Sequence, residues 1–168
     1  PFTLSLHQAL VFTVGKQSYA LPLAHLMGLT RITREEYKNY VDNKQSQMKY
    51  SNDLYNLFSL VDLLGEDKKI NDFKNATTLS VIFLQSAPHH IALVVEKLIG
   101  SCEVVIKPAG TQLQFVQEIS GVSILGDGQI ILILDAPSII QRGLIRISHG
   151  LLKDNRPRVS ALKSALDK

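Results

Sequence analysis

Residues 119–135 read ISGVSILGDGQIILILD, an apolar run that is broken once, by Gly126-Asp127-Gly128. Apolar runs on both sides of a glycine-containing break are typical of a β-hairpin. A phosphate-binding loop would need GxxxxGK[ST] opening into a long helix, whereas Gly128 is followed by the strand-like run 129–134. We therefore interpret Gly126, Asp127 and Gly128 as a structural turn whose residues take a positive φ.

Similar apolar runs bounded by turn residues recur along the chain, which predicts an all-β protein. Only short helices are expected, at 24–28, 60–64, 96–99 and 136–141. The polar stretch 65–76 (GEDKKINDFKNA) is interpreted as a surface connection. The expected strands are 9–14, 18–23, 47–51, 54–57, 78–85, 90–95, 101–107, 113–116, 122–125 and 129–134.

An internal repeat at an offset of about 72 residues organises these elements. Residues 20–28 (ALPLAHLMG) align with 92–100 (ALVVEKLIG), with four identities in nine positions. Residues 53–62 (DLYNLFSLVD) align with 126–135 (GDGQIILILD) at nearly the same offset. Two matches in the same order predict two similar barrels of about five strands each, whose closure removes exposed sheet edges.

The second match makes Asp62 and Asp135 equivalent, because each ends an apolar run and precedes a short expected helix. An aspartate in that place accepts the free backbone N–H groups of the first helical turn. We therefore interpret Asp62 and Asp135 as helix caps. A metal site would need partner ligands nearby, and the sequence supplies none.

Charge divides the chain into two parts. Residues 1–141 hold 11 basic and 13 acidic groups, whereas residues 142–168 hold seven basic and two acidic groups. We expect a folded domain over 1–141 and a basic linker or tail over 142–168 that leads to a further domain. The chain begins at Pro1, which suggests a piece of a longer protein. It has neither an 18-residue apolar stretch nor a signal peptide, so we expect it in the cytoplasm.

The residues that carry catalysis or cofactor binding are sparse. The five histidines and the single cysteine lack the spacing of a zinc site, and no GxSxG elbow is present. Cys102 lies in an apolar run and is expected to be a buried thiol. We expect no catalytic residue, no metal and no cofactor in this domain. An enzyme that uses Asp127 or Asp135 is the alternative.

Nucleic-acid binding is also disfavoured. Phosphate contacts need a basic face, and the part of the chain over 1–141 is acidic on balance. The basic tail contains no aromatic residue on which bases could stack. A nucleic-acid-binding barrel is therefore a weaker alternative.

Residues 104–110 (VVIKPAG) and 119–140 (ISGVSILGDGQIILILDAPSII) resemble the closing half of CheW-like domains. They are most similar to the regulatory domain of CheA-type histidine kinases, and the resemblance extends over roughly residues 8–141. It implies two SH3-like barrels without catalytic activity, inside a histidine kinase that dimerises through other domains. The implied partners are a CheW-type coupling protein and the tips of methyl-accepting chemoreceptors. A free-standing CheW-type adaptor is the alternative.

One stretch departs from the flagellar members of that family. They usually carry Arg-Gly where this chain has Leu54 and Tyr55, and a proline where it has Ser59. The departure resembles kinases of the type IV pilus (twitching) chemosensory branch, which are often large hybrids with a receiver domain.

A domain without chemistry acts through its surface, so we expect an exposed apolar patch. Leu26 and Met27 cannot both face the core of a one-turn helix, and Leu29 and Ile32 continue the apolar residues past Gly28. We predict that Leu26, Met27, Leu29 and Ile32 bind the partner. The alternative is that all four are core packing.

Overall fold

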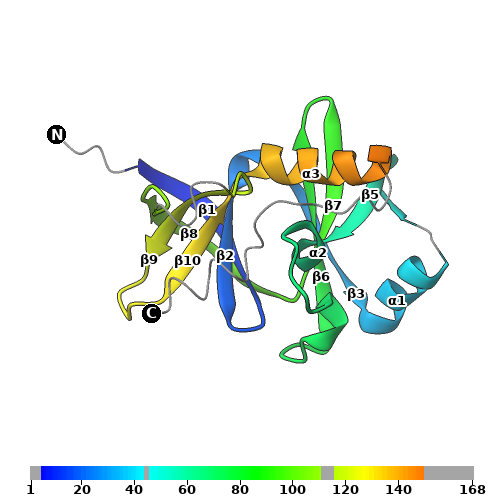
Figure 1. Cartoon of the computed structure of the whole chain (residues 1–168), viewed down its shortest axis with the longest axis horizontal. Coiled ribbons are helices and arrows are strands. Elements are labelled where there is room, and N and C mark those ends of the chain that lie inside the picture. Colours follow the sequence, from blue (N-terminus) through cyan, green and yellow to red (C-terminus); the bar gives the residue numbers. More distant parts are fainter. Residues whose placement is uncertain (1–4, 44–45, 111–115, 150–168) are drawn as a thin grey trace.

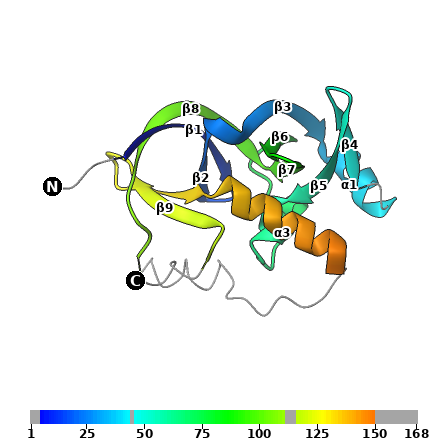
Figure 2. The same ribbon diagram turned by 90° about the horizontal axis from the view of Figure 1, so that it is seen from above.

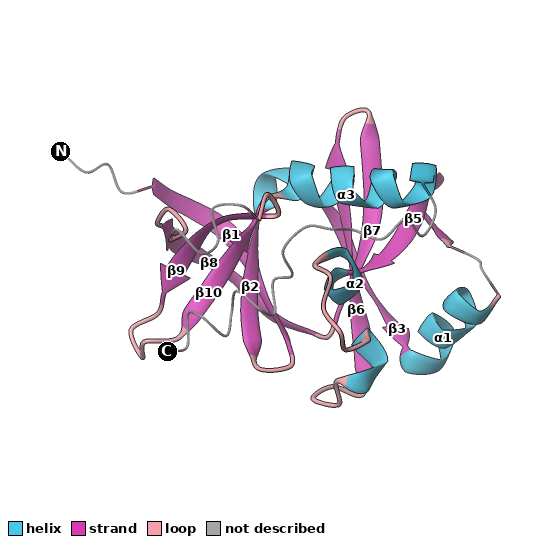
Figure 3. Cartoon of the chain, viewed as in Figure 1, coloured by secondary structure: helices cyan, strands magenta, loops and turns pink. Residues whose placement is uncertain are grey.

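The computed structural model describes residues 5–43, 46–110 and 116–149, which form ten strands in two five-stranded sheets (Figure 3). The sheet that we call barrel A has the order β8-β1-β2-β10-β9, and barrel B has the order β3-β6-β7-β5-β4. The predicted all-β fold with two five-stranded barrels is confirmed. The strands are β1 (Ser5–Val14), β2 (Gln17–Pro22), β3 (Leu26–Thr33), β4 (Gln47–Tyr50), β5 (Asp53–Ser59), β6 (Thr78–Ser86), β7 (His89–Val95), β8 (Lys97–Ile106), β9 (Ile119–Ile124) and β10 (Ile130–Leu134).

The helices differ more from the expectation. The expected helices at 24–28 and 96–99 are wrong, because β3 already begins at Leu26 and β8 at Lys97. Only a short 3-10 turn, η1 (Leu23–His25), precedes β3. The helix expected at 60–64 is present as α2 (Leu60–Leu63). The expected strand 113–116 lies outside the described residues except for Val116.

Helix α1 (Arg34–Asp42) was not expected, although the sequence carries a signal for it. Thr33 Oγ1 accepts from the Glu36 backbone N–H, and the Glu36 carboxylate accepts from the Thr33 N–H. This reciprocal pair is a capping box, and its Thr-x-x-Glu pattern is readable from the sequence alone.

The strands connect the two barrels at two points, once in each direction. It leaves barrel A at the end of β2 and enters barrel B at β3, and it returns from β7 to β8. The aligned segments 20–28 and 92–100 are these two crossovers. The first half of the repeat therefore marks the points at which the chain changes barrels (Figure 1).

The second half of the repeat was aligned three residues out of register. Leu57 pairs with Ala92 in barrel B as Ile133 pairs with Ala20 in barrel A. The counterpart of Asp135 is therefore Ser59, and Asp62 lies inside α2. The expectation that Asp62 caps a helix is wrong, and its Oδ1 instead lies 3.0 Å from Lys69 Nζ.

Helix α3 (Ala136–His149) is longer than the expected 136–141 and extends from barrel A across barrel B (Figure 2). Asp135 Oδ2 accepts from the Ser138 backbone N–H, the contact of an N-cap. Arg142 Nε donates to Glu118 Oε1 at 2.9 Å, and both side chains are buried. The division expected between residues 141 and 142 falls inside this helix, and residues 150–168 lie outside the described part.

One continuous apolar core runs through both barrels. Phe12 and Tyr19 of barrel A belong to the same buried cluster as Ile82 and Leu93 of barrel B. Each fully buried side chain of this size stabilises the fold by roughly 1.5–3 kcal/mol. Barrel A also holds a smaller, separate cluster, which includes Val11, Val104 and Ile133, so it combines a core of its own with its part of the shared cluster.

The stretch 65–76, expected as a surface connection, lies between the two barrels and contacts barrel A. We call this contact region between the barrels the seam. It contains the 3-10 turn η2 (Ile70–Asp72), and Ile70 is buried. The hydroxyl of Tyr19 in barrel A donates to Glu66 Oε1 at 3.2 Å. Burial, and secondly the Glu66 carboxylate, raise the pKa of Tyr19. The polar composition of the stretch concealed the apolar contact that Ile70 makes.

The break in the opening stretch is a turn between β9 and β10. Leu125 N–H donates to Gln129 O, and Gln129 N–H donates to Asp127 Oδ1 at 2.9 Å. Gly128 has φ +86°, whereas Gly126 is not in the left-handed region. A Cβ atom at either glycine would meet nothing within 4 Å. The two positions therefore differ in backbone conformation and not in available space.

We predict that Gly128→Val lowers the free energy of unfolding by about 1–3 kcal/mol, because valine is strained at a positive φ. Gly126→Val is the matched control and should cost much less, and Asp127→Asn should be mild because asparagine tolerates turns. Urea denaturation of the three variants measures this. An equal loss of unfolding free energy in Gly126→Val and Gly128→Val would contradict the conclusion that only Gly128 needs a positive φ.

Candidate functional site

The structure separates the four residues that were predicted to bind a partner. Met27 and Leu29 are exposed, with 50% and 41% of their surfaces accessible. Leu26 is half-buried against the core, and Ile32 is only 7% exposed. Successive residues of a strand face opposite sides, so Leu29 and Ile32, which are an odd number of positions apart, point in opposite directions. Ile32 is therefore excluded from the surface, and the exposed pair Met27 and Leu29 is called the β3 surface below.

Met27 is exposed because the β3 ladder contains a bulge. Leu26 pairs with Leu84 and Gly28 pairs with Phe83, which leaves Met27 without a partner in β6. An extra residue of this kind bends the strand and turns its side chain away from the regular alternation. The one-turn helix that was expected here is replaced by an irregular strand.

Tyr50, at the end of β4, contacts both the backbone of β3 at the bulge and β6. The Tyr50 hydroxyl donates to Met27 O at 3.4 Å, and its ring stacks on Phe83 with centroids 4.2 Å apart. A Cβ atom on Gly28 would come within 2.0 Å of that hydroxyl oxygen. Gly28 is thus required for the close approach of Tyr50, which fixes the backbone on both sides of the exposed Met27.

Barrel A contains a counterpart of Met27 that sequence reasoning missed. Leu98 pairs with Phe12 and Gly100 pairs with Val11, so Ile99 is the unpaired residue of a bulge in β8. Ile99 is 59% exposed. The repeat already aligned Met27 with Ile99, and the signal was available as a large apolar residue before glycine in both crossovers.

A second group of exposed apolar residues surrounds the turn between β9 and β10. Ile124 and Ile130 face each other across this hairpin, and Leu125 follows Ile124. These three residues are called the hairpin surface below. In barrel B, Leu54 of β5 occupies the position equivalent to Ile130 and is also exposed.

The two aspartates that were considered for an enzyme, Asp127 and Asp135, have local structural partners. The carboxylates of Asp127 and Asp135 are engaged by nearby backbone N–H groups. In residues 5–43, 46–110 and 116–149 no three His, Cys, Asp or Glu side chains lie where they could share a metal ion. Burial and the Asp62 carboxylate raise the pKa of Tyr37 to about 12, which keeps this phenol protonated.

Two further features concern the surface. Cys102 is exposed, so the expected buried thiol is wrong; within the run 101–104 only Val104 is buried. Among the described helices, none has the length and apolar character needed to cross a lipid bilayer.

Comparison with known protein families gives a match over most of the chain. The family model described as CheW-like domain matches residues 8–143. Among solved structures, the scaffolding protein TtCheW from Thermoanaerobacter tengcongensis has the same fold, with a TM-score of 0.59 and 12% identity. That match covers 78% of this chain and 90% of TtCheW. The two barrels are therefore SH3-like barrels in the CheW arrangement.

Curated relatives carry this sequence as one part of a longer chain. The chemotaxis protein CheA of Treponema pallidum is 34% identical over 146 residues, which is 87% of this chain and 18% of that protein. The sensor histidine kinase CheAY of Helicobacter pylori is 31% identical over 83% of this chain and 17% of its own length. CheA of Bacillus subtilis is 33% identical over 83% of this chain and 20% of its own length. The chain thus spans about a fifth of these relatives.

We predict that Leu29→Glu changes the free energy of unfolding by less than about 1 kcal/mol, because the new carboxylate stays in water. Ile32→Glu on the same strand should cost more than about 3 kcal/mol, because it buries an unpaired charge. Thermal melting of both variants measures how much stability the same new residue, glutamate, costs at an exposed and at a buried position of β3. A large loss of stability in Leu29→Glu would place Leu29 in the core and contradict the β3 surface.

Proposed function

The chain belongs to the CheW-like domain family, and from this premise we propose that it is the coupling module of a CheA-type chemotaxis histidine kinase. In this role it performs no catalysis and joins the kinase to a CheW-type adaptor and to chemoreceptor tips in the cytoplasm. The kinase activity resides elsewhere in the longer protein. The similarity to two chemotaxis proteins CheA and to the sensor histidine kinase CheAY, over more than 80% of this chain, supports this assignment.

The observation that carries the proposal is the exposure of apolar residues at equivalent places in both barrels. Met27 and Ile99 form one such pair, and Leu54 and Ile130 form another. Exposed apolar patches of a soluble domain commonly mark contacts with other proteins. Two similar patches on two barrels fit a module that contacts more than one neighbour.

A free-standing CheW-type adaptor is the alternative, and TtCheW has the same fold. The kinase assignment is favoured because the relatives described above are kinases that match this chain at 31% to 34% identity. Immunoblotting of the native protein distinguishes the two, since only the kinase assignment requires a product several times longer than 168 residues.

We predict that Leu29→Glu and Ile130→Glu each weaken binding of the purified CheW-type adaptor by about tenfold or more, because interface energy is concentrated in a few apolar residues. Titration calorimetry measures this beside a melting curve for each variant. Lys38→Glu, on the exposed face of α1, is the control for added negative charge. Wild-type affinity in both folded variants would remove the β3 and hairpin surfaces from the binding site.

A further inference from the structure

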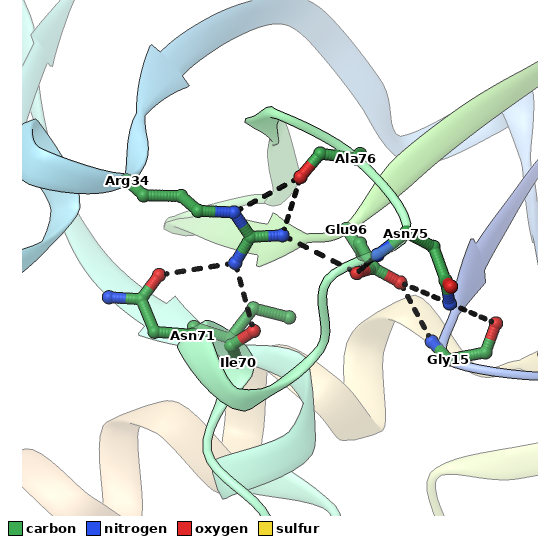
Figure 4. A network of polar contacts seen from close by, with 7 residues as sticks. All are labelled: Gly15, Arg34, Ile70, Asn71, Asn75, Ala76 and Glu96. Atoms are coloured by element: carbon green, nitrogen blue, oxygen red, sulfur yellow. Dashed lines mark hydrogen bonds and ion pairs between the residues drawn. The ribbon is translucent and has the colours of Figure 1, made fainter.

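A buried carboxylate lies where the chain returns from barrel B to barrel A. Glu96, between β7 and β8, is 1% exposed. Its Oε1 accepts from the Gly15 backbone N–H at 2.9 Å and from Asn75 Nδ2 at 3.3 Å. Its Oε2 accepts from the Asn75 backbone N–H at 2.9 Å and lies 3.4 Å from Arg34 Nη2 (Figure 4). Four donors thus satisfy a charge that would otherwise be costly to bury.

Arg34, the first residue of α1, uses all of its donor groups in this network. Its Nε and Nη2 donate to Ala76 O at 3.1 and 2.7 Å, and Nη1 donates to Ile70 O and to Asn71 Oδ1. With the contact to Glu96, the guanidinium makes five contacts, one for each N–H that it possesses. A lysine has three donors on a single atom and cannot reproduce this planar arrangement.

The network joins parts of both barrels. Gly15 lies in the turn between β1 and β2 of barrel A, and Arg34 begins the helix that follows β3 of barrel B. Asn75 Nδ2 also donates to Gly15 O at 3.2 Å, so Gly15 is held through both its N–H and its carbonyl. The Phe73 ring lies against the same turn, because a Cβ atom on Gly15 would come within 2.7 Å of Phe73 Cε1.

We propose that the Arg34–Glu96 network fixes the orientation of barrel A relative to barrel B. The shared apolar core keeps the barrels together, but apolar contacts are not directional. Hydrogen bonds require particular distances and angles, so a network that spans the seam selects one orientation. Glu96 is the central positioning residue, because its side chain contacts both the barrel A turn at Gly15 and the guanidinium of Arg34.

The orientation has a consequence for binding that rests on the proposed function. The β3 surface belongs to barrel B and the hairpin surface to barrel A. The angle between the barrels therefore sets the separation of the two surfaces. A partner assembly that contacts both surfaces binds strongly only when the geometry allows simultaneous contact.

Spin labels measure the orientation directly in the free protein. Cys102 is the only cysteine of the chain and is exposed in barrel A, and Lys49→Cys adds an exposed label in barrel B. A second pair, Cys102 with Gly126→Cys, lies within barrel A and reports on unfolding of that barrel. Pulsed electron paramagnetic resonance gives the distance distribution for each pair.

The test compares Glu96→Gln and Arg34→Lys with Lys69→Gln, which removes the exposed ion pair to Asp62. We expect both network variants to broaden or shift the distance distribution between the barrels and to leave the distribution within barrel A unchanged. Lys69→Gln should change neither. An unchanged distance between the barrels in folded network variants overturns the proposal. If Glu96→Gln does not fold, Arg34→Lys decides, because it keeps a positive charge beside Glu96.

Adaptor binding then separates this proposal from the proposed function. Both network variants should bind the purified CheW-type adaptor, which contacts the β3 surface and the hairpin surface, about tenfold more weakly than wild type, while Lys69→Gln should bind it with little change. If the wild-type protein does not bind the adaptor, the proposed function fails, and the distance measurements still decide whether the network orients the barrels.

Discussion

The exchange of the chain between two barrels is the constraint on which the rest of the structure depends. Barrel A is built from β1 and β2 at one end of the sequence and from β8 to β10 at the other, with all of barrel B inserted between them. The β1 strand therefore pairs with β2 and with β8, which is about 90 residues away. Barrel A is thus completed by strands that follow all the strands of barrel B in the sequence.

Each crossover has to lead a strand out of one sheet and into the other without leaving its backbone unpaired. The bulges at Met27 and Ile99 occur next to these points, each followed by a glycine. A bulge bends the strand and exposes one side chain. The bulge that redirects the chain therefore also places an apolar residue on the surface. In this way the topology is linked to the candidate binding site.

The sequence predicts the barrels well and their connections poorly. Runs of apolar residues, some of them alternating with polar residues, are sufficient to predict most of the strands. The glycine break at 126–128 predicts a hairpin because apolar runs lie on both sides of it. The β3 strand was missed because a bulge and exposed residues interrupt its period, so that 24–28 read as a helical turn. The cap at Asp62 failed because two apolar runs that end in aspartate, Leu-Val-Asp at 60–62 and Ile-Leu-Asp at 133–135, were aligned, whereas strand pairing makes Ser59 the counterpart of Asp135.

The seam could not be predicted for a different reason. Its residues are polar, far apart in the sequence, and unremarkable individually: Gly15, Arg34, Asn75 and Glu96. A buried ion pair is not in itself strong evidence for stability, because desolvation of two charges offsets much of their attraction. It does discriminate strongly among arrangements, because any orientation that separates the donors from Glu96 leaves a charge buried without partners. The shared apolar core accounts for the association of the two barrels, and the polar network accounts for the selection of one orientation.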